Sequence, residues 1–231
     1  MTVLALDSTE KTASAALTAN GRLIAEVTLN TGNTHSEHLL PMIDGIMKCS
    51  GVGYDDIDLF AFSAGPGSFT GVRIGAATVK GLAFGRNKPC VGVSALEAMA
   101  YSLPFVRGII CPVMDARRSQ LYNALFRSDG QSIVRLTEDR TIPADVLADE
   151  LSALGEKTAF IGGGYDIISK AADGKIDVIN TSEALKYESA LSVAILAEKQ
   201  YNKGNYVSDV DLRPIYLRPS QAERMKNGDN S

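Results

Sequence analysis

Apolar residues recur at two different spacings in the first quarter of the chain. Short runs, either apolar or alternating with polar residues, predict strands at 3–6, 12–18 and 22–29, with Asn20-Gly21 as a hairpin turn. Between residues 36 and 48 the apolar positions follow a helical period instead. The pattern therefore predicts an antiparallel meander followed by an amphipathic helix.

Strands and helices alternate in the rest of the chain. Short apolar runs predict further strands at 59–63, 89–93, 158–161 and 177–179. Helical spacing predicts helices at about 69–84, from 96 onward, and at 143–154, 165–172 and 189–202. This alternation is typical of an α/β fold.

The second half of the chain repeats the pattern of the first. Residues 3–7 and 109–115 are both apolar runs that end in aspartate, and Asn20-Gly21 and Asp129-Gly130 are both turns. The offset is 108 residues at the aspartates and 109 at the turns. Because such a match at nearly constant spacing rarely arises by chance, we predict an internal duplication.

The duplication predicts the domain organisation. One lobe spans residues 1–106 and the second spans residues 107–218. Residues 219–231 are polar enough to form a tail outside both lobes.

The segment from Gly65 to Gly75 predicts a sharp turn that leads directly into the helix at 69–84. Ser68 is a suitable N-cap for that helix. Gly67, Gly71 and Gly75 form one helical stripe without side chains, although a glycine inside a helix costs about 1 kcal/mol relative to alanine. Some other group must therefore approach the stripe closely: the chain's own sheet, a helix of a partner, or an anion at the helix N-terminus.

The composition limits the kinds of partner that the chain can bind directly and indicates its cellular compartment. With a net charge of −4 over 231 residues, the chain does not present the broad basic surface that independent nucleic-acid binding requires. The three cysteines have neither zinc-site nor disulfide spacing, which favours reduced thiols in the cytoplasm. No signal peptide or membrane-spanning run is recognised. We therefore expect a cytoplasmic protein with no membrane contact, which meets RNA through a more basic partner.

Three motifs carry a resemblance to a known family. Asp7-Ser8-Thr9, the glycine segment 65–75 and Met114-Asp115-Ala116-Arg117 resemble the bacterial TsaB family, formerly called YeaZ, over nearly the whole chain. That family lies in the superfamily of actin, sugar kinases and Hsp70. The resemblance implies an α/β fold of two tandem actin-like ATPase (ribonuclease H-like) lobes that arose by internal duplication.

The resemblance also implies a function and a set of partners. TsaB supports a catalytic paralog, TsaD, which with the ATPase TsaE moves a threonylcarbamoyl group onto N6 of the tRNA adenosine beside the anticodon. The chain is therefore expected to be a required but non-catalytic subunit, which pairs with itself when alone and meets tRNA indirectly.

The expected interface with TsaD, or with a second copy, lies on the two helices at 36–48 and 69–84. A cation such as Arg73 near a helix N-terminus meets an unfavourable dipole, so we expect it to pair with Asp44 or with an acid across the interface. The residues assigned to this interface are His35, His38, Leu39, Ile43, Ile46, Met47, Gly67, Gly71, Arg73 and Gly75. The alternative is that both helices simply cover the lobe's own sheet.

Neither a catalytic residue nor a metal site is assigned. TsaD-type proteins hold a metal with histidines four residues apart, whereas His35 and His38 are three apart. No phosphate-binding lysine stands beside Asp7, so the chain alone is expected to bind no cofactor, and ATP is expected only at the level of the complex. The residues assigned to a vestigial nucleotide cleft are Asp7, Ser8, Asp115, Arg117, Gly162 and Gly163.

Two other functions stay open on the sequence. One is a self-contained ATP-dependent small-molecule kinase of the same superfamily. The other is a peptidase that acts on the TsaD paralog, with Ser68 as its nucleophile.

Overall fold

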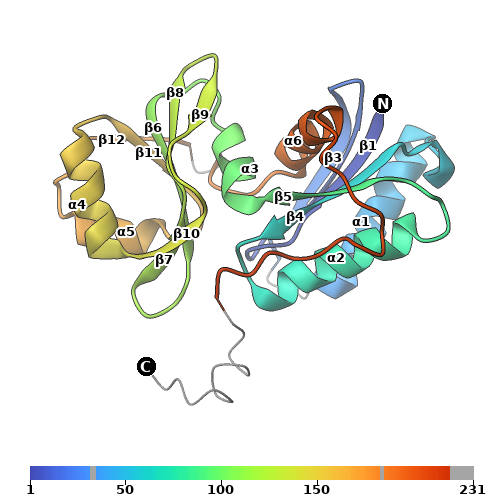
Figure 1. Cartoon of the computed structure of the whole chain (residues 1–231), viewed down its shortest axis with the longest axis horizontal. Helices are drawn as coiled ribbons and strands as arrows, with labels where there is room; N and C mark the ends of the chain where they lie inside the picture. The colour runs from blue at the N-terminus through green and yellow to red at the C-terminus, as the bar shows by residue number, and fades with distance from the viewer. Residues whose placement is uncertain (32–34, 183–184, 219–231) are drawn as a thin grey trace.

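Each half of the chain forms an α/β lobe around its own sheet (Figure 1). The computed structural model describes residues 1–31, 35–182 and 185–218, so the predicted tail at 219–231 lies outside the described residues. No described helix is both long enough and apolar enough to cross a membrane.

The first sheet has five strands in the order β3-β2-β1-β4-β5. Its strands are β1 (Thr2–Asp7), β2 (Ala13–Ala19), β3 (Arg22–Leu29), β4 (Leu59–Gly65) and β5 (Cys90–Ser94). The first three form the predicted antiparallel meander, and β4 and β5 add parallel strands beside β1. Helices α1 (His35–Ser50) and α2 (Phe69–Ala83) pack together on one face, with the single turn η1 (Tyr54–Asp56) between α1 and β4.

The second sheet repeats this order. Strand β6 (Arg107–Asp115) takes the central place of β1, with antiparallel strands on one side and parallel β11 on the other. The remaining strands are β7 (Gln120–Asn123), β8 (Phe126–Asp129), β9 (Ile133–Arg135), β10 (Arg140–Pro143), β11 (Thr158–Ile161) and β12 (Val178–Ile179). Helices α4 (Ala144–Leu154) and α5 (Tyr165–Ala172) cover one face, as α1 and α2 do in the first lobe. The matching topologies support the predicted duplication.

The antiparallel partner of β6 is split into two strands, β7 and β8, and Pro112 explains the split. Proline has no N–H to donate to a ladder, so the antiparallel partner of β6 is interrupted there. Strand β8 pairs with residues 107–110, and β7 pairs with residues 113–115. Asn123 fills part of the gap by donating from Nδ2 to the carbonyl oxygen of Pro112 at 3.0 Å.

The lobes exchange one helix each. Helix α3 (Ala95–Tyr101) follows the first sheet but packs mainly against the second, where Leu96 and Met99 are fully buried with Ile110 and Phe126. Ala98, on its other side, lies in the core of the first lobe. Helix α6 (Ala190–Asn202) does the reverse and covers the free face of the first sheet (Figure 1). The assignment of all of residues 107–218 to the second lobe is therefore wrong for α6, whose apolar side chains complete the core of the first.

Residues 203–218, here called the C-terminal segment, continue from α6 along α2 (Figure 1). Val207 forms two backbone hydrogen bonds with Cys90, and the Ile215 amide donates to the carbonyl oxygen of Ala64 at 2.8 Å. Leu212 is buried in the core of the first lobe. At the end of the segment, Arg218 donates to the carbonyl oxygen of Ala116 in the second lobe at 2.6 Å. The segment thus adds a further contact between the two lobes.

Candidate functional site

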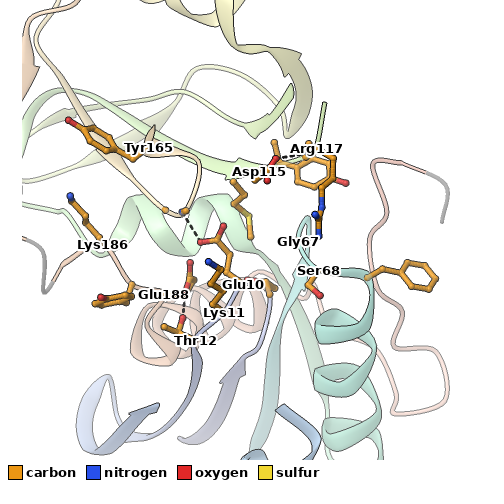
Figure 2. Close-up of a pocket in the computed structure, with 18 of the residues that line it drawn as sticks. Glu10, Lys11, Thr12, Gly67, Ser68, Asp115, Arg117, Tyr165, Lys186 and Glu188 are labelled. Atoms are coloured by element: carbon orange, nitrogen blue, oxygen red, sulfur yellow. Dashed lines mark hydrogen bonds between the residues drawn. The ribbon is translucent and has the colours of Figure 1, made fainter. Parts of the chain in front are cut away.

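A cleft of about 1040 Å³ lies between the lobes, and Figure 2 shows the residues that surround it. The turn after β1 and the glycine turn before α2 form one wall, and the turns after β6 and β11 form the other. The cleft is lined by Thr9, Glu10, Lys11, Thr12, Asn30, Gly67, Ser68, Phe69, Thr70, Met114, Asp115, Ala116, Arg117, Tyr122, Gly162, Gly163, Tyr165, Asp166, Lys186, Tyr187, Glu188 and Arg218.

The glycine stripe of α2 contacts the chain's own first turn. A Cβ on Gly71 would lie 2.0 Å from the carbonyl oxygen of Ser8, and one on Gly67 would lie 2.5 Å from that of Thr9. At Gly75 the nearest atom is the Ser8 hydroxyl, at 2.8 Å. The assignment of these glycines to a partner interface is therefore wrong, because the segment that needs their missing side chains is the turn after β1.

The apolar residues assigned to the same interface are also internal. Leu39, Ile43, Ile46 and Met47 are all at most 6% exposed and pack against the first sheet. The helical period located these residues correctly, but their face of α1 points to the lobe's own core. The outward faces of α1 and α2 carry other residues.

Arg73 has a different partner from the one predicted. Its guanidinium lies 4.2 Å from the centre of the Phe69 ring and donates to the Tyr216 hydroxyl at 3.1 Å. Asp44 instead accepts from the Tyr54 hydroxyl at 2.6 Å. Among the described residues Arg73 forms no ion pair, so the aromatic rings and the C-terminal segment take the place of the expected carboxylate.

The two histidines begin α1, as expected of a polar pair at a helix start. His35 lies 2.8 Å through Nε2 from the carbonyl oxygen of Glu10, whereas Nε2 of His38 is buried without a hydrogen bond among the described residues. No group of three His, Cys, Asp or Glu side chains in the described part of the chain is arranged to hold a metal ion.

Asp7 and Ser8 hold the first turn in place and do not face the open cleft. Asp7 is 1% exposed, and its Oδ1 accepts from both the amide and the hydroxyl of Thr9 at 2.9 and 2.7 Å. Burial and the nearby carboxyl of Glu188 raise the pKa of Asp7 to about 6, against the opposing effect of the Thr9 bonds. Ser8 donates from its hydroxyl to the carbonyl oxygen of Gly71 at 2.9 Å.

Glu10 bridges the two lobes across the cleft (Figure 2). Its Oε2 accepts from the Gly163 amide at 2.8 Å, and a Cβ on Gly163 would lie 2.9 Å from the same carboxylate. Beside it, buried Glu188 accepts from the Thr12 hydroxyl. Burial and the proximity of Glu10 raise the pKa of Glu188 well above its usual range. Sequence reasoning missed this carboxyl pair, because no local pattern connects residues that lie so far apart in the chain.

The turn after β6 is strained. Arg117, Arg118 and Ser119 have φ angles of 70°, 56° and 56°, a left-handed conformation that costs a non-glycine residue about 1–2 kcal/mol. Two bonds secure it: the Arg117 amide donates to Oδ1 of Asp115 at 2.6 Å, and the Ala144 amide donates to the carbonyl oxygen of Ser119 at 3.1 Å. Arg117 and Asp115 therefore lie in the cleft together, as predicted, but as parts of one tight turn.

Comparison with known proteins identifies the family. A family model described as TsaD, tRNA N6-adenosine threonylcarbamoyltransferase, matches residues 22–226. The tRNA threonylcarbamoyladenosine biosynthesis protein TsaB of Haemophilus influenzae is 33% identical, with 94% of each chain covered. The chain belongs to the TsaB family. TsaB of Bacillus subtilis is likewise 33% identical over 96% of each chain.

A solved structure from Pseudomonas aeruginosa agrees with the TsaB assignment. That protein, described as uncharacterized with similarity to peptidase YEAZ, has a TM-score of 0.81 and 27% identity. The alignment covers 94% of this chain and 99% of that one. The fold is therefore the two-lobed, actin-like fold of TsaB proteins.

Ser68 has a structural contact in this TsaB protein. Its hydroxyl accepts from the Gly71 amide at 3.2 Å, which is the N-cap that the sequence predicted. The contact explains the serine at this position without a role as a peptidase nucleophile.

The cleft does not suit the nucleotide that the actin-like fold implies. The amide of Gly163, in the glycine turn assigned to that ligand, is already bonded to the Glu10 carboxylate. A polyphosphate placed there would be repelled by Glu10 and would displace it from its hydrogen bond. Asp7 is buried beneath the turn rather than directed into the cleft.

Proposed function

We propose that this chain is the non-catalytic partner subunit of a cytoplasmic complex that makes threonylcarbamoyladenosine in tRNA. A TsaD-like paralog transfers the threonylcarbamoyl group to N6 of the adenosine beside the anticodon, a TsaE-like ATPase assists, and this chain supports the TsaD-like subunit. The observation that carries the proposal is similarity to TsaB proteins over the whole chain.

The chemistry of the cleft supports a non-catalytic role. Glu10 and Glu188 are engaged with Gly163 and Thr12, and Ser68 caps α2. The same contacts support the proposal that the chain alone binds no nucleotide and that any ATP acts at the level of the complex.

The partner surface is proposed on the outward faces of α1 and α2. Leu40 is 49% exposed and Phe84, at the end of α2, is 74% exposed. Gly45 and Gly81 have no other atom within 4 Å of an added Cβ, so they leave room for a partner's side chains. These residues replace the buried ones first assigned to the interface. The same surface would serve for self-pairing when the TsaD-like subunit is absent.

Replacing Leu40 with arginine tests this surface. A charge in the middle of an apolar contact is expected to weaken binding of the TsaD-like subunit at least about tenfold, which corresponds to 1.4 kcal/mol. Val146 on α4, the counterpart of α1 in the second lobe, is 51% exposed and provides the matched control Val146→Arg. Binding is measured by co-elution and titration, after circular dichroism has shown that both variants fold.

The function itself is tested by reconstitution. tRNA, threonylcarbamoyl-adenylate and the TsaD-like and TsaE-like subunits are combined with or without this chain, and modified adenosine is measured by mass spectrometry. Product is expected only in the full mixture. Robust product from this chain alone, or from the mixture that lacks it, would refute the proposal.

A further inference from the structure

The C-terminal segment leaves a group of apolar side chains in contact with water. It holds more exposed large hydrophobic residues than any helix or strand in the described part of the chain. They are Tyr206, Val207, Val210, Ile215 and Tyr216. Single exposed apolar residues are ordinary, but several gathered on one short stretch are typical of a surface that binds another molecule.

The backbone of this segment is anchored on both sides of Val210. Val207 forms two hydrogen bonds with Cys90, Leu212 is buried in the core of the first lobe, and the Ile215 amide donates to Ala64. An anchored backbone presents its side chains without the entropy cost of ordering a flexible segment when a partner binds. The exposed residues are therefore held ready for a contact.

The segment adjoins the outward face of α2 (Figure 1). Lys80 donates from Nζ to the carbonyl oxygen of Val210 at 3.2 Å. The Tyr216 ring lies 5.0 Å from that of Phe69, and its hydroxyl accepts from Arg73. Arg73 belongs to a stripe of exposed residues along α2, which consists of Thr70, Arg73, Ala77, Gly81 and Phe84. Val210 and Tyr216 thus widen the surface that α2 presents.

The two helices alone supply little apolar area for a stable contact. Among the described residues, Leu40 and Phe84 are the large hydrophobic residues that α1 and the end of α2 expose. A stable protein interface buries about 800 Å² on each partner around an apolar centre. The segment supplies the missing apolar residues, and it adds tyrosine beside arginine, the residue types that most often dominate binding energy.

The chain's own tail does not supply a matching apolar surface. Residues 219–231 follow the segment, and Ala222 and Met225 are the only hydrophobic residues in that stretch of sequence. The apolar cover must therefore come from another chain. The partner that the family assignment indicates is the TsaD-like subunit.

We propose that the C-terminal segment is a direct part of the binding surface for the TsaD-like subunit, through Val210, Ile215 and Tyr216. Tyr216 and Arg73 form an anchor at one end of α2, and Val210 forms a second contact beside Lys80. This inference rests on the proposed function and deepens it, because it extends the partner surface beyond α1 and α2 to residues far away in the sequence.

Cross-linking tests whether the segment touches the partner. In the full chain, the photoreactive residue p-benzoyl-phenylalanine replaces Val210, and the protein is irradiated with the purified TsaD-like subunit. A covalent product with that subunit is expected and is identified by mass spectrometry. The same photoreactive residue in place of exposed Val146 on α4 is the matched control, and it is expected to give no such product.

Affinity measurements test which side chains matter. Val210→Arg and Tyr216→Ala are each expected to weaken binding of the TsaD-like subunit at least about fivefold. Tyr216→Phe keeps the ring and should lose less than about threefold, and Val146→Arg should leave the affinity unchanged. Circular dichroism first shows that each variant folds. Since Val210 is exposed, Val210→Arg keeps the test valid even if Tyr216→Ala disturbs the fold.

Two outcomes would overturn the inference. If the two subunits co-elute but position 210 gives no cross-link and Val210→Arg binds normally, the segment lies outside the interface. If position 210 cross-links to a second copy of this chain while the TsaD-like subunit is bound, the segment serves self-pairing instead. In both cases the reconstituted assay with the unaltered chain still yields modified adenosine, whereas failure of the proposed function appears as loss of that product.

Discussion

Gly71 has no space for even a methyl group, because the carbonyl oxygen of Ser8 lies 2.0 Å from where its Cβ would be. We expect Gly71→Ala to lower the free energy of unfolding by roughly 1–3 kcal/mol or more through overpacking. Gly81 in the same helix has open space where a Cβ would lie. Gly81→Ala is therefore expected to raise the free energy of unfolding by up to about 1 kcal/mol. Urea unfolding of the isolated chain measures both. Equal effects would show that the turn after β1 does not pack on this stripe.

The buried carboxyl of Asp7 makes stability depend on pH. Because its pKa is raised from 3.8 to about 6, the folded chain holds this proton more tightly than the unfolded chain. The resulting stabilisation is fully present below pH 3.8 and is lost as the pH rises through 6. Asp7→Asn keeps the oxygen that accepts from Thr9 and removes the titration. The free energy of unfolding of the variant should match that of the wild type near pH 4 and exceed it by roughly 1–3 kcal/mol at pH 8.

Urea midpoints at pH 4 and pH 8 check this expectation. The pH dependence that Glu188 contributes should persist in the variant, because burial raises its pKa as well. A variant that is less stable than the wild type at pH 8 would show that the charged form of Asp7 is favoured in the fold.

At the residue level, sequence reasoning succeeded where the cause is local. Ser68 was recognised as an N-cap from the helix that follows it, and the structure confirms the bond to Gly71. The Glu10 contact with Gly163 has no local signal, since it depends on how two lobes meet. For the same reason the glycine stripe predicted a close approach without identifying the group that approaches.

At the level of elements, the C-terminal segment stabilises the first lobe through one buried side chain. Leu212 is 3% exposed, so Leu212→Ala should lower the free energy of unfolding by about 2–4 kcal/mol. Val210, two residues earlier and 66% exposed, provides the control. Val210→Ala should change the free energy of unfolding by less than about 0.5 kcal/mol. A thermal melt compares the two; a small effect at Leu212 would mean that the segment only rests on α2.

Hydrophobic periodicity located most strands and helices, because the residues that determine such an element lie within its own segment of the sequence. The helices predicted at 143–154 and 189–202 are observed as α4 at Ala144–Leu154 and α6 at Ala190–Asn202. Periodicity did not predict which lobe each helix packs on, because an apolar stripe fits any apolar sheet face of suitable shape. Pro112 did carry a readable signal: a proline inside a predicted central strand indicates a break in the pairing.

At the level of the whole molecule, the helix exchange makes the lobes depend on each other for folding. A fragment of residues 1–106 lacks α6 and leaves the face around Val3, Ala5 and Leu59 exposed to water. We expect this fragment to bind a hydrophobic dye and to melt without cooperativity, and the full chain to unfold in a single transition. Adding residues 107–218 in trans should restore the transition. A fragment that folds cooperatively alone would show that α6 is dispensable.

The exchange also sets a delay during synthesis on the ribosome. About one hundred residues separate β5 from α6, and at 5–20 residues per second their translation takes roughly 5–20 s. Throughout that time the first sheet has emerged with one apolar face uncovered, because the helix that protects it has not yet been made. We therefore expect the nascent chain to bind chaperones that hold exposed apolar surface, and slower translation between these two elements to lengthen its exposure to aggregation.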